Sequence, residues 1–319
     1  MGNCCCIPKP FSFEMQGAFH DPRLRILTEK DAQAALEVMV HSQSGDEHIA
    51  GNGAWSWIYQ ESSEEPQSED RLNSFRWAMS CVLWSGLRYG VVVGIDCPNA
   101  PPAYRGLGGL FILYPPETDP VYLGHCAKRK LYPVMKHINK YHANDMTITQ
   151  KHRYSKMISE FKTQRVSVDE ELGKDKYCYL QCVCVPPRMR GKGIRDVLMG
   201  AVDDVSGMLP VYLECSRREV KYLISKGFSE GVHMIIDTGS VTKHTKNDLE
   251  LVGMVWTPAP VNLIVTKCSS MFPMAGEEID YEENDEERHP EHEDDTPDSK
   301  QEYYGGRRKT PNFLTAPAY

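Results

Sequence analysis

The sequence predicts an α/β fold in which a mixed central sheet is flanked by helices. The first observation is a central strand at 176–185, where apolar side chains fall on both faces. The second is an amphipathic helix at 194–205, which directly follows a short basic loop containing two glycines. The third is the alternation of strand and helix patterns on both sides of this unit, which is typical of mixed α/β domains.

The elements before the central strand follow helical or strand periodicity in turn. Thr28 and Asp31 form a helix start similar to a capping box, with Asp in place of Glu, and apolar residues then recur on one face. The predicted elements are a strand at 24–26, a helix at 32–40, a polar loop at 43–70, a helix at 72–83, strands at 89–95 and 107–114, and helical stretches at 131–138 and 157–161.

The central strand carries three cysteines that share one face with Leu180, namely Cys178, Cys182 and Cys184. Free cysteines inside a sheet usually pack as small hydrophobic residues, and we favour that interpretation over a CxC metal pair. The elements predicted after the strand are the helix at 194–205, a strand at 210–215, a short helix at 219–225 that ends at Gly227, and strands at 233–236 and 250–256.

Composition and charge exclude several classes of protein. The 319 residues, 41% of them hydrophobic, contain no apolar run long enough to cross a membrane and no signal-peptide core. The eleven cysteines are odd in number and lack CxxC pairs, so we expect a reducing compartment, no disulfide framework and no metal. Of the net charge of −8, residues 277–300 carry −11, which leaves +3 for the rest of the chain. No strongly basic face is expected, and therefore no nucleic-acid partner.

The first twenty residues predict a lipid anchor. The chain starts MGNCCCIPKP, in which Gly2 is an acceptor for N-myristoylation and Cys4, Cys5 and Cys6 are acceptors for palmitate. Two acyl chains would hold the protein durably on the cytoplasmic face of a membrane. Cys6 departs from the acylation pattern, which prefers Ser or Thr there. The alternatives are a cytoplasmic protein with incidental thiols, or a redox-sensitive or metal-binding tip.

The last segment, 261–319, is predicted to be a disordered acidic tail. Hydrophobic periodicity ends near Thr266, and the acidic run is followed by scattered prolines and a Gly305–Gly306 pair. Such a chain buries too little apolar surface to order itself. A solvated tail is the simpler interpretation, and a docking segment for a basic partner is the alternative.

Residues 179–201, YLQCVCVPPRMRGKGIRDVLMGA, predict an anion site. A strand runs into a Pro-Pro break, a glycine loop and a helix, so free N–H groups and the positive end of the helix dipole point to one place. Arg188, Arg190 and Lys192 add positive charge that suits a pyrophosphate. Neither GxxxxGK[ST] nor GxGxxG is present, so the common nucleotide-binding signatures do not fit.

This loop resembles the acyl-CoA loop of the GNAT superfamily of acetyl-CoA-dependent N-acetyltransferases, whose pattern is Arg/Gln-x-x-Gly-x-Gly/Ala. Residues 190–194 match, whereas Arg195 stands at the last small position. The resemblance extends over about 24–258, within a domain placed at 21–260, and its outer matches are similar to a fungal and bacterial branch. Those matches are RILTEKD at 25–31, GLRYG at 86–90, GLFILYPP at 109–116, VYLECS at 211–216, KGF at 226–228 and MVW at 254–256.

The resemblance implies a GNAT fold and transfer of an acetyl group from acetyl-CoA to a small-molecule or peptide primary amine, by direct attack in a ternary complex. It also implies a splay between the central strand and its neighbour that admits the cofactor. The implied cofactor contacts are backbone groups of Val183, Cys184 and Val185 for pantetheine, those of Arg190, Gly191, Lys192, Gly193, Ile194 and Arg195 for pyrophosphate, and Ser216.

Two candidate catalytic residues emerge, each with a structural alternative. Glu214 is the best-placed general base, and its alternative is a strand-end carboxylate in a structural hydrogen bond. Many family members carry a tyrosine acid where this chain has Leu223, while Tyr222 lies one residue earlier, as a displaced acid or a packing residue. Arg195 opposes the helix dipole, or it grips a phosphate itself. These departures keep open a second function, a catalytically degenerate scaffold or CoA sensor.

Overall fold

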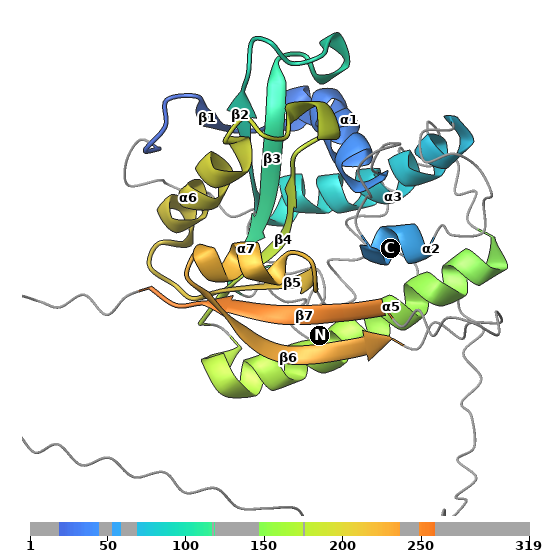
Figure 1. The fold of residues 1–319 in the computed structure, drawn as a ribbon, viewed down its shortest axis with the longest axis vertical. Helices are drawn as coiled ribbons and strands as arrows, with labels where there is room; N and C mark the ends of the chain where they lie inside the picture. Colours follow the sequence, from blue (N-terminus) through green and yellow to red (C-terminus); the bar gives the residue numbers. More distant parts are fainter. Residues whose placement is uncertain are drawn as a thin grey trace, which may run out of the picture. The chain divides into compact units, whose positions relative to one another are not determined.

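The computed structural model describes residues 19–44, 53–58, 69–116, 118, 147–174, 176–236 and 249–258 (Figure 1). In this part of the chain seven strands form one sheet, in the order β1-β2-β3-β4-β5-β7-β6. The strands are β1 (Leu24–Ile26), β2 (Val91–Asp96), β3 (Leu107–Tyr114), β4 (Cys178–Cys184), β5 (Val211–Ser216), β6 (Phe228–Ile236) and β7 (Leu249–Trp256). The helices are α1 (Ala32–Ser44), α2 (Gly53–Ile58), α3 (Glu69–Tyr89), α5 (Ile148–Val168), α6 (Ile194–Ser206) and α7 (Val220–Ser225).

The sheet is mixed, as the sequence predicts. Neighbouring strands pair antiparallel throughout, except for β4 and β5, which run parallel. A parallel pair needs a crossover connection, and α6 provides it between these two strands. The strand–loop–helix unit predicted from residues 179–201 is therefore the crossover at the centre of the sheet.

Helices cover both faces of the sheet. A Cβ placed on Gly86 of α3 would meet the side chain of Ile112 at 2.7 Å, whereas one on Gly109 would meet Ile194 and Leu198 of α6 at 3.0 and 3.1 Å. Residues 109 and 112 are an odd number of positions apart on β3 and so face opposite sides. Accordingly, Figure 1 shows α6 on one side of β3, and α1 and α3 on the other.

Several predicted helices are longer than expected. The helix predicted at 72–83 is α3, which runs from Glu69 to Tyr89. The helix predicted at 32–40 runs to Ser44, because Ser42, Gln43 and Ser44 are buried and Ser42 contacts the end of β4. Before it, the Asp31 carboxylate accepts from the N–H of Thr28 at 2.9 Å, which confirms the predicted capping box; the box caps a 3-10 turn at Glu29–Asp31 that leads into α1. The stretch predicted at 157–161 is part of α5, and the stretch at 131–138 lies outside the described residues.

The polar loop is predicted over roughly 43–70, with an interruption at Trp55, Trp57 and Ile58. The structure extends helices into both ends of that range and forms α2 at the interruption, which the sequence does not identify as a helix. Ala54 and Ile58 are buried one helical turn apart, and the ring of Trp55 stacks on that of Tyr154 with centroids 6.0 Å apart. A six-residue helix is too short for periodicity to detect. β6 also begins at Phe228, earlier than predicted, with an irregularity between Glu230 and His233.

The predicted anchor and tail lie outside what the structure describes. Residues 1–18 and 259–319 are not among the described ranges, and these segments contain Gly2, the three cysteines and the acidic run. The boundaries drawn at 20 and 260 therefore stay predictions.

Candidate functional site

β4 and β5 separate almost as soon as they begin. They pair at two rows, Cys178 with Val211 and Tyr179 with Tyr212, although β4 continues to Cys184 and β5 continues to Ser216. Where the two strands no longer pair, their facing backbone groups are left without ladder partners. The structure thus contains the splay expected beside the central strand.

A β-bulge marks the point of separation. The partners of Ile112 and Leu113 are Cys182 and Leu180, so Gln181 is an extra residue in β4. A bulge bends its strand and ends regular pairing, and the Gln181 Oε1 atom is buried without a hydrogen-bond partner among the described residues. The bend gives a physical cause for the splay, which sequence patterns did not reveal.

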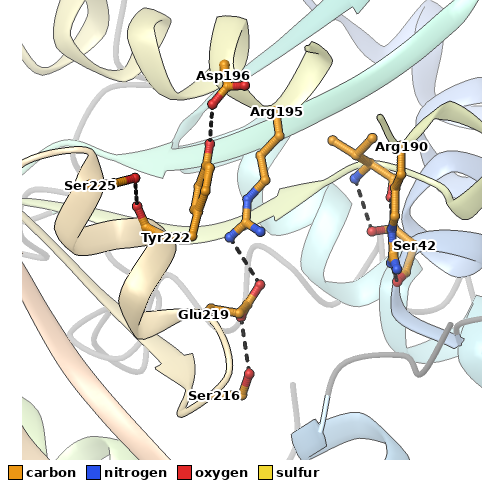
Figure 2. Close-up of polar contacts among 9 residues, drawn as sticks. Ser42, Arg190, Arg195, Asp196, Ser216, Glu219, Tyr222 and Ser225 are labelled. Atoms are coloured by element: carbon orange, nitrogen blue, oxygen red, sulfur yellow. Dashed lines mark hydrogen bonds and ion pairs between the residues drawn. The ribbon is translucent and has the colours of Figure 1, made fainter. Parts of the chain in front are cut away.

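The end of β4 is fixed to α1. The N–H of Val185 donates to Ser42 Oγ at 3.1 Å, and Arg190 donates from Nε to the carbonyl of Val185 at 3.3 Å and from Nη2 to the carbonyl of Ser42 at 3.4 Å (Figure 2). Both backbone groups of Val185 are therefore used within the protein. Val183 and Cys184 belong to the part of β4 that does not pair with β5.

The loop before α6 presents a row of free backbone donors. The N–H of Arg190 donates to the carbonyl of Pro187, and those of Asp196 and Val197 donate to the carbonyl of Gly193. Between them, no hydrogen bond among the described residues uses the N–H groups of Gly191, Lys192, Gly193, Ile194 and Arg195. Five of the six residues predicted to hold a pyrophosphate thus have a free donor, and the N–H of Arg190 does not.

Glycine is required in this loop by its backbone. Gly191 and Gly193 have φ of +74° and +71°, in the left-handed region, where other residues are strained. A Cβ on either residue would find no atom within 4 Å, so the space in front of the backbone is open. Arg188 and Lys192 are exposed beside it, whereas Arg190 points back into the fold. An anion could reach the free donors and two mobile cations together.

A network of charged side chains joins α6 to α7 (Figure 2). Arg195 donates from Nη2 to Glu219 Oε1 at 3.2 Å, and its Cζ lies 3.7 Å from the centroid of the Tyr222 ring. The Tyr222 hydroxyl donates to Asp196 Oδ1 at 3.0 Å, and Lys226 Nζ lies 2.6 Å from the same oxygen. The hydrogen bond from Lys226 is the main cause that lowers the pKa of Asp196.

This placement turns the candidate acid Tyr222 toward the first turn of α6. Burial raises the pKa of Tyr222; the charge of Arg195 opposes that rise, and the hydrogen bond to Asp196 adds to it. Leu223, which stands where the resemblance places a tyrosine acid, is buried. Ser216, the predicted cofactor contact, donates to Glu219 Oε2 at 3.5 Å.

The candidate base Glu214 lies in a buried ion pair. Arg165 of α5 donates from Nε to Glu214 Oε1 at 3.0 Å, and the two side chains are 1% and 4% exposed. The guanidinium lies over the Tyr179 ring, 3.3 Å from its centroid, and 5.5 Å from that of Tyr212. Burial tends to lower the pKa of Arg165, but the charge of Glu214 raises it overall. The arrangement fits the alternative interpretation of Glu214, a carboxylate in a structural hydrogen bond. The role of Glu214 as a general base stays a prediction.

Sequence reasoning missed three residues that shape the site. Arg165 lies among polar residues in a helix of weak periodicity, so nothing local marks it as buried. From the sequence, Glu219 is indistinguishable from an ordinary surface carboxylate at the start of a short helix. Ser42 could have been found from the sequence. It belongs to a polar run at 41–44 that continues the apolar face of a helix, and such a run suggests a contact with buried backbone groups.

Within the described ranges, no helix has both the length and the apolarity that crossing a bilayer requires. In the same ranges, His, Cys, Asp and Glu side chains do not gather in threes or more as metal ligands would.

Comparison with known proteins finds likenesses in fold. No protein-family model and no curated protein sequence matches the chain. A histone acetyltransferase HPA2-related acetyltransferase from Corynebacterium glutamicum has a similar structure, with 15% identity and a TM-score of 0.42, over 74% of this chain and 96% of that one. Arylalkylamine N-acetyltransferase 2 from Aedes aegypti is also similar, with 12% identity and a TM-score of 0.46, over 74% of this chain and 98% of that one. PaiA N-acetyltransferase from Thermoplasma acidophilum was solved in complex with coenzyme A. It has 13% identity and a TM-score of 0.35, over 74% of this chain and 98% of that one.

Proposed function

We propose that the protein is an N-acetyltransferase that moves the acetyl group of acetyl-CoA to a primary amine. The observation that carries the proposal is the splay of β4 from β5 beside a glycine loop with five consecutive N–H groups that have no hydrogen-bond partner among the described residues. The splay suits an extended chain with amide groups, and the loop suits a pyrophosphate. Acetyl-CoA contains both in the same order.

The chemistry asks little more than positioning. A thioester is already activated, so the amine nitrogen attacks its carbonyl carbon, the C–S bond breaks, and the thiolate leaves while the amine loses a proton. The backbone of Val183 and Cys184 would hold the pantetheine, and residues 191–195 would hold the pyrophosphate. Glu214 and Tyr222 remain the predicted base and acid, and we expect no covalent acyl-enzyme.

Calorimetric titration of the full chain with acetyl-CoA tests the cofactor site. Gly193→Ala should weaken binding about tenfold or more, because it strains the loop and places a methyl group in the open space before the free donors. Gly207→Ala is the matched control: Gly207 ends the same helix at φ +62°, and a Cβ added there would also find no atom within 4 Å. Equal binding by both variants, or no binding by the wild type, would contradict the proposal.

A second function is favoured by a specific observation. Both candidate proton-transfer groups are engaged, Glu214 with Arg165 and Tyr222 with Asp196. A catalytically degenerate scaffold or CoA sensor would bind the cofactor without turnover. Thiol release measured across a panel of primary amines separates the two functions, and Tyr222→Phe, which removes one hydroxyl, then tests the proposed acid.

We propose in addition that acyl chains on Gly2 and on Cys4, Cys5 or Cys6 tether the protein to the cytoplasmic face of a membrane. Two adjacent kinds of acylation acceptor within six residues support this. Mass spectrometry of the N-terminal peptide from native material should find myristate and palmitate. Unmodified Gly2 would overturn the tether. The acidic run at 277–300 is proposed as a docking segment for a basic partner, which a salt-sensitive interaction lost on deleting 277–300 would support.

A further inference from the structure

Arg195 belongs to the anion site by its backbone but not by its side chain. Its N–H is one of the five loop donors without a partner among the described residues, while its guanidinium extends to Glu219 and lies over the Tyr222 ring (Figure 2). The loop therefore tolerates a large residue at a position where relatives have a small one, because the side chain is drawn away from the open backbone.

The contact that draws Arg195 away is weak and open to water. The Arg195 and Glu219 side chains are 37% and 38% exposed, and ion pairs with this exposure contribute little because water and salt screen them. Glu219 also has a second partner, since Ser216 donates to its other carboxylate oxygen. Neither carboxylate nor guanidinium would be left without solvent or a partner if the pair opened.

An anion at the loop would compete for the same guanidinium. A cation in the first turn of a helix opposes the helix dipole, and a bound phosphate removes that penalty. Phosphate oxygens accept charge-assisted and often bidentate bonds from arginine. Rotation of the Arg195 side chain would bring its donors to the anion that its own N–H binds.

We propose that the Arg195 side chain binds a phosphate at the loop and that, without this phosphate, it pairs with Glu219. Phosphate binding by Arg195 and the Arg195–Glu219 ion pair therefore exclude one another. The proposal rests on the acyl-CoA function proposed above. It adds a coupling between the two sides of the splay, because Glu219 lies three residues after the end of β5 and Arg195 lies in the first turn of α6. Cofactor binding would release Glu219 and free α7 from one of its links to α6.

A double-mutant cycle in calorimetric titrations with CoA tests it. Arg195→Ala should weaken CoA binding about tenfold through the loss of a charged hydrogen bond. Glu219→Gln should tighten it about threefold, because the competing pair is gone. In the Arg195→Ala background, Glu219→Gln should change the affinity by much less. Thermal unfolding of each variant checks that the fold is kept.

The control is Glu230→Gln, which removes the same charge from another partly exposed pair, Arg217–Glu230, with the two atoms 3.0 Å apart. It should leave CoA affinity unchanged. Equal tightening by Glu219→Gln with and without Arg195 would mean simple charge repulsion and would overturn the proposal, as would Arg195→Ala binding within about twofold of the wild type. Failure of the wild type to bind CoA would instead overturn the acyl-CoA function itself.

3′-Dephospho-CoA identifies the phosphate involved. A loss on Arg195→Ala that persists with this ligand assigns Arg195 to the pyrophosphate, and a loss that disappears assigns it to the 3′-phosphate. Both results support phosphate binding by Arg195.

Discussion

Two regions of the molecule use the same three side-chain types for different ends. At the splay, Arg165 pairs with Glu214 at 3.0 Å and covers the Tyr179 ring; between α6 and α7, Arg195 pairs with Glu219 at 3.2 Å and covers Tyr222. Their geometries are nearly alike, but the first pair is 1% and 4% exposed and the second is 37% and 38% exposed.

Access to water decides what each pair can do. A buried charge that loses its partner has no solvent to replace it, so the Arg165–Glu214 pair holds α5 to β5 and is costly to open. An exposed pair loses little on opening, so Arg195 is free to move to a better anion. Residue identity therefore does not distinguish a structural pair from an exchangeable one, whereas burial does.

The largest expected effect follows from breaking the buried pair. Arg165→Met removes the guanidinium partner of Glu214 in the core, and we expect the free energy of unfolding to fall by about 3–5 kcal/mol in urea titrations. Arg195→Met is the matched change in the exposed pair and should lower it by less than about 1 kcal/mol.

The double variant Arg165→Met with Glu214→Leu sharpens this test. It removes both charges and should recover much of the lost stability, since apolar replacement of a buried ion pair is often neutral. Equal losses in Arg165→Met and Arg195→Met would contradict the distinction between the two pairs.

A smaller effect is expected where α1 holds the end of β4. Ser42→Ala leaves the buried N–H of Val185 without an acceptor, and we expect a loss of about 1–3 kcal/mol in the same urea titrations. Ser85→Ala is the control, because Ser85 is as buried as Ser42 but its Oγ has no partner among the described residues. Ser42→Ala should also weaken CoA binding, since Val185 directly follows the strand segment proposed to hold the pantetheine. A loss no larger than that of Ser85→Ala would show that the contact does not stabilise β4.

The backbone of the site could be predicted from the sequence, and its side-chain partners could not. Gly191 and Gly193 allow left-handed backbone, and the helix after them necessarily has free N–H groups, so the anion loop follows from local rules. The pairing of Arg165 with Glu214 joins residues 49 apart, and it depends on how α5 is rotated about its axis. Weak helical periodicity does not fix that rotation.

Arg195 and Gln181 show the same division between local and long-range information. Arg195 was recognisable as a large residue at a small position, because the loop pattern is local. That Glu219 draws its guanidinium away depends on how closely α7 approaches α6, which only the folded chain determines. The Gln181 bulge is likewise set by pairing with β3 rather than by any residue pattern in β4.

The smallest expected effect is that of salt on the two pairs without ligand. At about 1 M salt the screening length falls to about 3 Å, so the exposed Arg195–Glu219 pair should lose its contribution to stability. Glu219→Gln should then change the free energy of unfolding by a few tenths of a kcal/mol at low salt and by nothing measurable at high salt. Glu214→Gln should remain strongly destabilising at both, because water and ions do not reach Arg165. Urea titrations of both variants at two salt concentrations measure this. A salt-independent effect of Glu219→Gln would mean that Glu219 acts through packing, and Arg195 would then not be free to exchange partners.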